Sequence, residues 1–316
     1  MSKLNIRILG LIAVAAATLP SVGNAGEIDW GKVKGLDITV FYPGQSSWEW
    51  ILTQSDHEGA KDLRKGKKCW DCHEAEEMDI GAKIASGKKL EPNPIAGKRP
   101  AFNVNVKAAN DGQNLYVRLA WPDGGSKVQN KEDPKFEEKA TILIGDDSQV
   151  AFKRGGCWSV CHDDLIDMPS AGNMKLEKYL AESRTKITRQ GGGEGYKSDQ
   201  ELADLLANGT FVELWQARLN RDSISAVDGY ILEKIHENDH PDISVTGGLQ
   251  DGEWVVVFSR KLIDKGAGRK SFKPGEIMHF GIAIHDDYAA HRHHNVSFGR
   301  TLSIDSGDAD IVAEKQ

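Results

Sequence analysis

After residue 100 the chain alternates apolar and polar residues with a period of two. Phe102, Val104 and Val106 share one face of the first such stretch, an Asn-Asp-Gly turn follows, and residues 115–121 alternate in the same way. Alternation of this kind is typical of strands with one buried face. A short turn between two such stretches predicts a β-hairpin.

Further short stretches extend this pattern to the end of the chain. The expected strands lie at residues 139–145, 210–219, 242–248, 253–262, 278–286 and 295–304. Helical periodicity occurs mainly at residues 174–186 and 198–209, and Ser198 and Gly209 suit the cap and the stop of the second helix. Many short strands separated by Gly, Asn and Asp turns indicate a mainly β chain, folded as an antiparallel β-sandwich.

Residues 26–98 differ from the rest of the chain. They contain few stretches with strand periodicity, several charges and a Pro-Asn-Pro break at 92–94. We expect a small, mostly helical and irregular lobe there, followed by the sandwich at 99–308 and a tail at 309–316. The two predicted helices form an insertion in the sandwich at about 170–209.

The first residues have the layout of a secretory signal peptide. Lys3 and Arg7 precede an apolar run at 8–22, and small residues follow up to Ala25, after which we expect cleavage. The alternative is an uncleaved membrane anchor, but the run is shorter than the roughly 20 residues that a spanning helix needs. No later segment is apolar enough to cross a bilayer, so the mature protein is expected in the periplasm without a membrane span.

The formal net charge of the sequence is −7, and removal of Lys3 and Arg7 with the leader would bring it to about −9. Nucleic-acid phosphates repel such an acidic chain, so nucleic acid is not expected as a partner. The charge suits a protein that meets other proteins transiently.

The four cysteines form two pairs, and a histidine directly follows each pair. Cys69, Cys72 and His73 have the spacing C-x-x-C-H, which is the attachment signature of c-type haem. The two thiols add to the vinyl groups of the porphyrin, and the histidine ligates the iron. A zinc site made by all four cysteines is the alternative. It would leave both histidines unexplained, and an oxidising compartment disfavours free thiolates.

The second motif, made by Cys157, Cys161 and His162, is one residue longer. The extra residue can loop out without moving the last cysteine and the histidine, so covalent haem is expected here too. The alternatives are a single thioether, or a disulfide beside a non-covalent haem. Together the motifs use all four cysteines and predict two haem c groups.

An iron that only transfers electrons usually has a second axial ligand. For the first haem we expect His57, because a short helix over residues 58–64 would fold the chain back over the first motif. Met78 is the alternative ligand, and a plain surface histidine is the other interpretation of His57.

For the second haem the sequence offers a stretch with four histidines at 285–294. We expect His294 as the ligand, because it directly precedes a predicted strand and one ring there should face inward. His293 and Met168 are the alternatives, and a histidine-rich surface metal patch is the remaining interpretation.

Five segments resemble, in order, the haem-binding subunit of ethylbenzene dehydrogenase and the related domain of dimethyl sulfoxide reductase-type systems. They are DGQNLYVRLAWPD, GGCWSVCHDDLIDMP, VELWQARL with AVDGYI, DGEWVVVFSRKL, and HFGIAIHDD with HHNVSFGRTLSI, spread over residues 100–305. The resemblance implies a β-sandwich that holds one haem in an electron-transfer chain. The best-known members bind haem b through Met and Lys, whereas this chain carries a Cys-Cys-His attachment and resembles an exported c-type branch. The segment that precedes the sandwich lies outside the resemblance.

We therefore expect a periplasmic dihaem c-type cytochrome that passes single electrons between a quinol-side donor and a periplasmic oxidoreductase, such as a molybdenum-type enzyme, or another cytochrome. The basic stretch at 61–68 is either a docking patch for an acidic partner or a solvated helix face. The alternative function is a haem enzyme with one open iron site that reduces peroxide or nitrite, with Asp286 or Asp287 as a proton donor. Trp70 and Trp158, inside the motifs, either line a haem edge or only pack.

Overall fold

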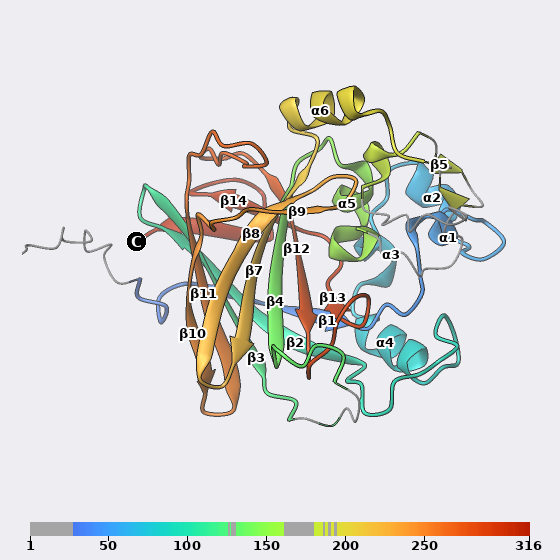
Figure 1. Ribbon diagram of the computed structural model, residues 1–316, viewed down its shortest axis with the longest axis horizontal. Coiled ribbons are helices and arrows are strands. Elements are labelled where there is room, and N and C mark those ends of the chain that lie inside the picture. The colour runs from blue at the N-terminus through green and yellow to red at the C-terminus, as the bar shows by residue number, and fades with distance from the viewer. Residues whose placement is uncertain are drawn as a thin grey trace, which may run out of the picture.

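One large sheet forms the frame of the molecule (Figure 1). The computed structural model describes residues 28–125, 127, 131–160, 180–185, 187–188, 191–192 and 195–316. The strands of the 13-stranded sheet are β1 (Gly35–Phe41), β2 (Ala101–Asn110), β3 (Asn114–Pro122), β4 (Glu138–Gly145), β7 (Val212–Asn220), β8 (Ser223–Ile231), β9 (Ile235–Glu237), β10 (Ser244–Gln250), β11 (Glu253–Lys261), β12 (Met278–His285), β13 (Asn295–Val296), β14 (Arg300–Ile304) and β15 (Ile311–Lys315). The prediction of a mainly β chain is confirmed.

The strand order is β10-β11-β3-β2-β1-β13-β12-β4-β7-β8-β9, and β14 and β15 connect β12 to β2 by a second route. The predicted hairpin is present, since β2 and β3 pair antiparallel with Val106 opposite Leu119. Trp121 of β3, Trp215 of β7 and Trp254 of β11 are fully buried in one cluster. Because β3 and β7 are far apart in the strand order, the sheet must curve so that its two parts face each other across this core.

The helices gather mainly on one side of the sheet (Figure 1). They are α1 (Trp48–Ile51), α2 (Ala60–Arg64), α3 (Trp70–His73), α4 (Glu77–Ala85), α5 (Val150–Gly155) and α6 (Asp199–Ala207), with 3-10 turns η1 (Gly156–Ser159) and η2 (Ala181–Ser183). The short helix expected near residues 58–64 is α2, and α6 begins at its predicted cap Ser198, whose side chain and that of Glu201 form a reciprocal capping box.

A second hydrophobic cluster joins these helices to the outer face of the sheet. Leu143, Leu214, Ala283 and Val296 contribute from β4, β7, β12 and β13. The helical segments contribute, among others, Leu63, Cys69, Phe152, Cys157 and Trp158. Both cysteine motifs therefore reach the same apolar layer, and this layer positions the site.

Strand β1 lies within the segment that sequence alone assigned to the lobe. It pairs with β2 over its whole length, and its Phe41 pairs with Val296 of β13. The side chains of Ile38 and Val40 are fully buried in the main core. The sheet therefore draws one of its central strands from residues 26–98.

Two predicted boundaries also differ at the end of the chain. The expected tail contains β15, which pairs in parallel with β14 and β2, so the sheet is not purely antiparallel. The strand expected at 295–304 is split into β13 and β14. At Ser297 the backbone amide still donates to the Ile282 carbonyl at 2.9 Å, but the Ile282 amide donates to the Ser297 hydroxyl, also at 2.9 Å.

Part of the predicted insertion can be compared with the structure. Residues 181–183, expected in an α-helix, form a 3-10 turn, and β5 (Ile187–Thr188) pairs with β6 (Gly191–Gly192). The expected signal peptide at 1–25 and the start of that helix lie outside the described residues.

Candidate functional site

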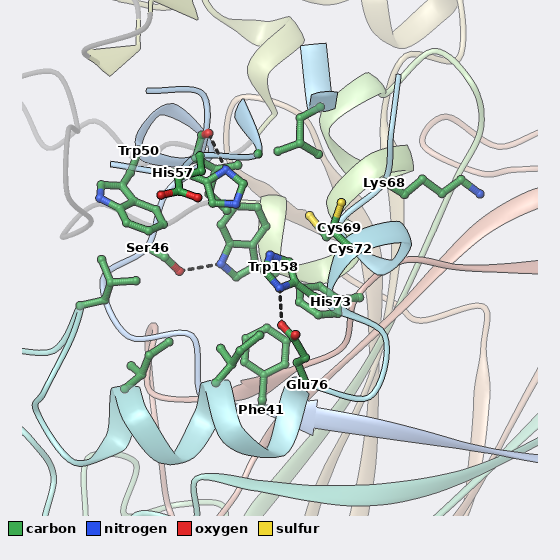
Figure 2. A pocket seen from close by; sticks show the side chains of 18 of the residues that line it. Phe41, Ser46, Trp50, His57, Lys68, Cys69, Cys72, His73, Glu76 and Trp158 are labelled. Carbon is green, nitrogen blue, oxygen red and sulfur yellow. Dashed lines mark hydrogen bonds and ion pairs between the residues drawn. The ribbon is translucent and has the colours of Figure 1, made fainter. Parts of the chain in front are cut away.

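Helix α3 places the first motif on one face of a single helical turn. Residues at i, i+3 and i+4 share a helix face, and this is the spacing of Cys69, Cys72 and His73. The turn is closed by the amides of Cys72 and His73, which donate to the Cys69 carbonyl at 3.2 and 3.0 Å. Asp71 stabilises its start, since its carboxylate accepts from the Lys68 amide at 2.8 Å. Both thiols and one imidazole are thus presented together (Figure 2).

These three residues line a cavity of about 630 Å³. A volume of this size is typical of cofactor sites. The apolar and aromatic lining includes Phe41, Trp50, Leu63, Ile80, Ile84, Trp158 and Phe298, and basic side chains are contributed by Lys67, Lys68, Lys83 and Lys89. Lys89 also lies over the ring of Trp50, with Nζ 5.6 Å from the ring centre.

His57 lines the same cavity, and its ring centre lies 6.1 Å from that of His73. The Nδ1 of His57 is 3.1 Å from the Ile51 carbonyl oxygen, and the Nδ1 of His73 is 2.8 Å from a carboxylate oxygen of Glu76. Both partners can only accept, so both Nδ1 atoms carry the hydrogen. This leaves Nε2 of each ring without a hydrogen and able to bind a metal ion, which is the usual arrangement of metal-binding histidines.

Burial lowers the pKa of His57, and the nearby charges of His73 and Lys89 lower it further. The hydrogen bond to the Ile51 carbonyl raises it, but the net shift is downward. The ring is therefore neutral at pH 7, as an iron ligand must be. Burial raises the pKa of Cys69 to about 12, so this cysteine is a thiol at pH 7. Across the described part of the chain, His, Cys, Asp and Glu form no group of three or more suited to a metal ion.

The cavity, the paired thiols and the two Nε2 atoms fit a c-type haem. Imidazole nitrogens lie about 2 Å from a bound metal ion, so rings 6.1 Å apart leave room for one iron between them. The alternative ligand Met78 lies in the first turn of α4, but its side chain is 43% exposed and is not among those that line the cavity.

The second motif is described only in part. Cys157 lies in η1, buried against β12, where a Cβ on Gly281 would be 2.8 Å from the Cys157 amide nitrogen. Glycine at that strand position therefore lets η1 approach the sheet. Cys161, His162 and Met168 lie outside the described residues.

The two motifs are neighbours in space. The Cys69 amide donates to the Arg154 carbonyl at 3.0 Å, and the Arg154 guanidinium donates to the Leu63 carbonyl at 2.6 Å. Trp158, from the second motif, lines the cavity of the first and donates its indole N–H to Ser46 at 2.6 Å. No sequence signal indicated that this tryptophan would face the other motif.

The histidine-rich stretch forms a separate set of contacts. His294 is buried, its Nδ1 is 2.8 Å from the His291 carbonyl, and its ring centre is 4.7 Å from that of His285. His293 Nδ1 lies 2.5 Å from a Glu132 oxygen. Neither His293 nor His294 is among the residues that line the first cavity.

The two carboxylates considered as proton donors make structural contacts. Asp286 receives two hydrogen bonds from the Arg99 guanidinium, at 2.8 and 2.5 Å. Asp287 accepts from the Lys127 amide at 2.7 Å. Both contacts connect the loop after β12 to the segments that flank β2 and β3.

No helix among the described residues has the length and hydrophobicity to cross a membrane.

Comparison with known proteins gives consistent matches. The sequence model of the ethylbenzene dehydrogenase family matches residues 27–246, so it includes the N-terminal segment that the five motifs left out. The chain is 39% identical over 313 residues to cytochrome c-552 of Stutzerimonas stutzeri, covering 97% of this chain and 99% of that protein. It is 32% identical over 290 residues to cytochrome c-551 of Rhodocyclus tenuis, covering 91% and 99%. A family 9 carbohydrate-binding module from Caldicellulosiruptor kristjanssonii aligns at 12% identity and a TM-score of 0.28, covering 62% of this chain and 64% of that one, too weakly to bear on fold or function.

Proposed function

The chain belongs to the ethylbenzene dehydrogenase family and is a c-type cytochrome, and from this premise we propose that it is a periplasmic dihaem carrier of single electrons. The observation that carries the proposal is the pairing of His57 with Cys69, Cys72 and His73 around one cavity. A bound haem c supplies the one-electron Fe(III)/Fe(II) couple there.

The residues of the first cavity have distinct roles in this proposal. Cys69 and Cys72 form the two thioethers, His73 is the proximal ligand and His57 the distal one. Glu76 accepts the Nδ1 hydrogen of His73 at 2.8 Å, which orients the ring and increases the electron donation of Nε2. Phe298 stacks on His73, with ring centres 6.1 Å apart and planes at 23°, and excludes water from that side.

With His57 and His73 as axial ligands beside the four porphyrin nitrogens, the iron of the first haem would have no open position for a substrate. It would stay six-coordinate in both oxidation states, which would limit the structural change on electron transfer. This is the physical reason for preferring a carrier over an enzyme that reduces peroxide or nitrite.

The proposal extends to a second haem, bound through Cys157 and Cys161 with His162 as the proximal ligand. His294 is the proposed distal ligand, with His293 and Met168 as the competing candidates. We further propose that the segment expected as the sandwich, residues 99–308, forms a β-sandwich haem domain together with β1 and β15. The helices before β2 would form the lobe of the first haem.

The partners are redox proteins of the periplasm: a quinol-side donor, and an oxidoreductase or cytochrome as acceptor. Export follows from the expected signal peptide, cleaved after Ala25. The basic residues near the first cavity, Lys67 and Lys68, place positive charge beside the exposed Cys72. An acidic partner surface would be steered to that side.

The test is the optical spectrum of the purified holoprotein, oxidised and reduced, before and after addition of peroxide, nitrite, cyanide or carbon monoxide. We expect low-spin bands in both oxidation states and no change with any of these molecules. A high-spin fraction that shifts on their addition, with turnover of peroxide or nitrite, would contradict the carrier and favour the enzyme.

A further inference from the structure

Trp158 belongs to the second motif by sequence and to the wall of the first cavity by position. It directly follows Cys157 in η1, and it lines the cavity that holds His57 and His73 (Figure 2). Its side chain is 5% exposed. A single residue therefore touches the first site and is covalently continuous with an attachment cysteine of the second.

The orientation of this indole is held by two successive hydrogen bonds. Its N–H donates to the Ser46 hydroxyl at 2.6 Å, and that hydroxyl donates to the Pro43 carbonyl at 2.7 Å. Trp48 packs edge-on against it, with ring centres 6.3 Å apart. A buried indole with its N–H satisfied has little freedom to move, so its place at the cavity wall is fixed.

The backbone around Trp158 is equally tied to the first motif. Arg154, four residues earlier, accepts from the Cys69 amide at 3.0 Å. Gly156 has φ +69°, and a Cβ there would be 2.3 Å from the Gly299 amide nitrogen, so only glycine allows this close approach. Gly299 directly follows Phe298, another wall of the cavity. The distance between Trp158 and the first motif is therefore a rigid property of the fold.

We propose that Trp158 is the contact through which electrons pass between the two haems. This inference rests on the proposed function, since it requires a second haem on Cys157. One electron leaves the ferrous iron of one haem and reduces the ferric iron of the other, while Trp158 itself is neither oxidised nor reduced. Electron tunnelling slows steeply with separation and with gaps in packing, and Trp158 joins the wall of the first cavity to Cys157 through one continuous group of bonded atoms.

A purely packing role for Trp158 makes a different prediction, and Trp48 distinguishes the two. Trp48 is also a buried tryptophan of the same cluster, at 5% exposure, but it is not among the residues that line the cavity and does not adjoin a cysteine. Loss of either indole leaves a comparable cavity in the cluster. Only loss of Trp158 removes a side chain that lines the first cavity and adjoins Cys157.

The experiment compares W158L and W158F with the matched controls W48L and W48F, each as holoprotein. Intact mass first establishes how many covalent haems each protein carries. A laser flash then excites a photoreductant that delivers one electron to the protein. The movement of this electron from one haem to the other is followed by absorbance, at wavelengths where a stepwise redox titration has shown that the two haems differ. Its rate must not depend on the protein concentration, since the transfer is within one molecule. We expect W158L to slow this redistribution severalfold, W158F to slow it less, and both Trp48 variants to keep the wild-type rate.

A wild-type rate in W158L, or equal slowing in W48L, would overturn the inference. If the leucine variants do not retain both haems, the phenylalanine pair decides, since W158F must still be slower than W48F. A wild-type protein that carries fewer than two covalent haems would instead refute the proposed dihaem function, so the two failures are distinguishable.

Discussion

Glu91 holds the rim of the first cavity to the sheet, and its replacement by glutamine is a direct test of how that rim is held. Its buried carboxylate receives hydrogen bonds from the Arg292 guanidinium at 2.6 and 3.5 Å, from the Asn93 amide at 3.0 Å and from the Tyr42 hydroxyl. The preceding residue, Leu90, lines the cavity. The Glu91 contacts thus join the segment after α4 to the end of β1 and to the loop before β13.

The structure gives the size of the effect. The Glu91 and Arg292 side chains are 0% and 6% exposed, so E91Q removes the countercharge from a buried guanidinium. Breaking such a pair costs about 3–5 kcal/mol of unfolding free energy. At about 2.1 cal/mol/K of unfolding entropy per residue, a chain of about 300 residues loses about 1.6 °C of Tm per kcal/mol, so Tm should fall by about 5–8 °C.

The assay is thermal unfolding of the holoprotein followed by circular dichroism, with D29N as the control. Asp29 and Lys32 form an ion pair whose side chains are 54% and 78% exposed, and such pairs contribute little. D29N should therefore leave Tm close to that of the wild type. If E91Q lowers Tm no more than D29N does, the reasoning about the rim is refuted.

The same contact predicts a pH dependence. Burial raises the pKa of Glu91, but the hydrogen bonds from Arg292, Tyr42 and Asn93 outweigh it and hold the pKa below the ordinary 4.5. A depressed folded-state pKa stabilises the protein above the unfolded-state value, and this stability is lost as the pH falls through the folded-state pKa. The difference in Tm between wild type and E91Q should therefore be full near pH 7 and shrink below about pH 4.5. A difference that grows towards acid pH would contradict the sign of this shift.

Three further replacements probe the first cavity. H57A should convert the first haem from low-spin to high-spin, with recovery on adding imidazole, whereas M78A should leave the visible spectrum unchanged; the reverse pattern would make Met78 the ligand. E76Q should raise the midpoint potential of the first haem, because the carboxylate favours the ferric state. The rise should be less than about 59 mV, the value for a tenfold change in a one-electron equilibrium constant, because the ion pair of Glu76 with His73 is partly exposed. Spectroelectrochemical titration measures the potential, and a fall would contradict the expectation. K89Q should lower the same potential by removing positive charge from the cavity, and its neighbour K88Q should lower it less; equal shifts would argue against a special position for Lys89.

Sequence patterns predicted most of the sheet because its strands alternate strongly. Strand β1 was missed, although Ile38 and Val40 alternate with polar residues, because its length is modest and its partners lie far along the chain. The parallel strand β15 was missed because it is short and follows a polar, glycine-containing segment. In both cases tertiary pairing, rather than local pattern, makes the strand.

The site divides in the same way. C-x-x-C-H is local, so its geometry follows from one helical turn. That His57 lies beside the motif could be predicted, because it is close in sequence and a short helix turns the chain back; its role as a ligand stays a prediction. The position of Trp158 could not, because its hydrogen bond to Ser46 spans 112 residues of sequence and depends on how η1 packs on β12.

The central claim is two covalent haems on one chain, and the most direct measurement is the intact mass of the exported, denatured protein together with the masses of its proteolytic peptides. We expect a chain that begins at Gly26 and carries two added haems, one on the peptide that contains Cys69 and Cys72 and one on the peptide that contains Cys157. An intact mass with one haem or none, or a Cys69–Cys72 peptide without haem, would contradict it.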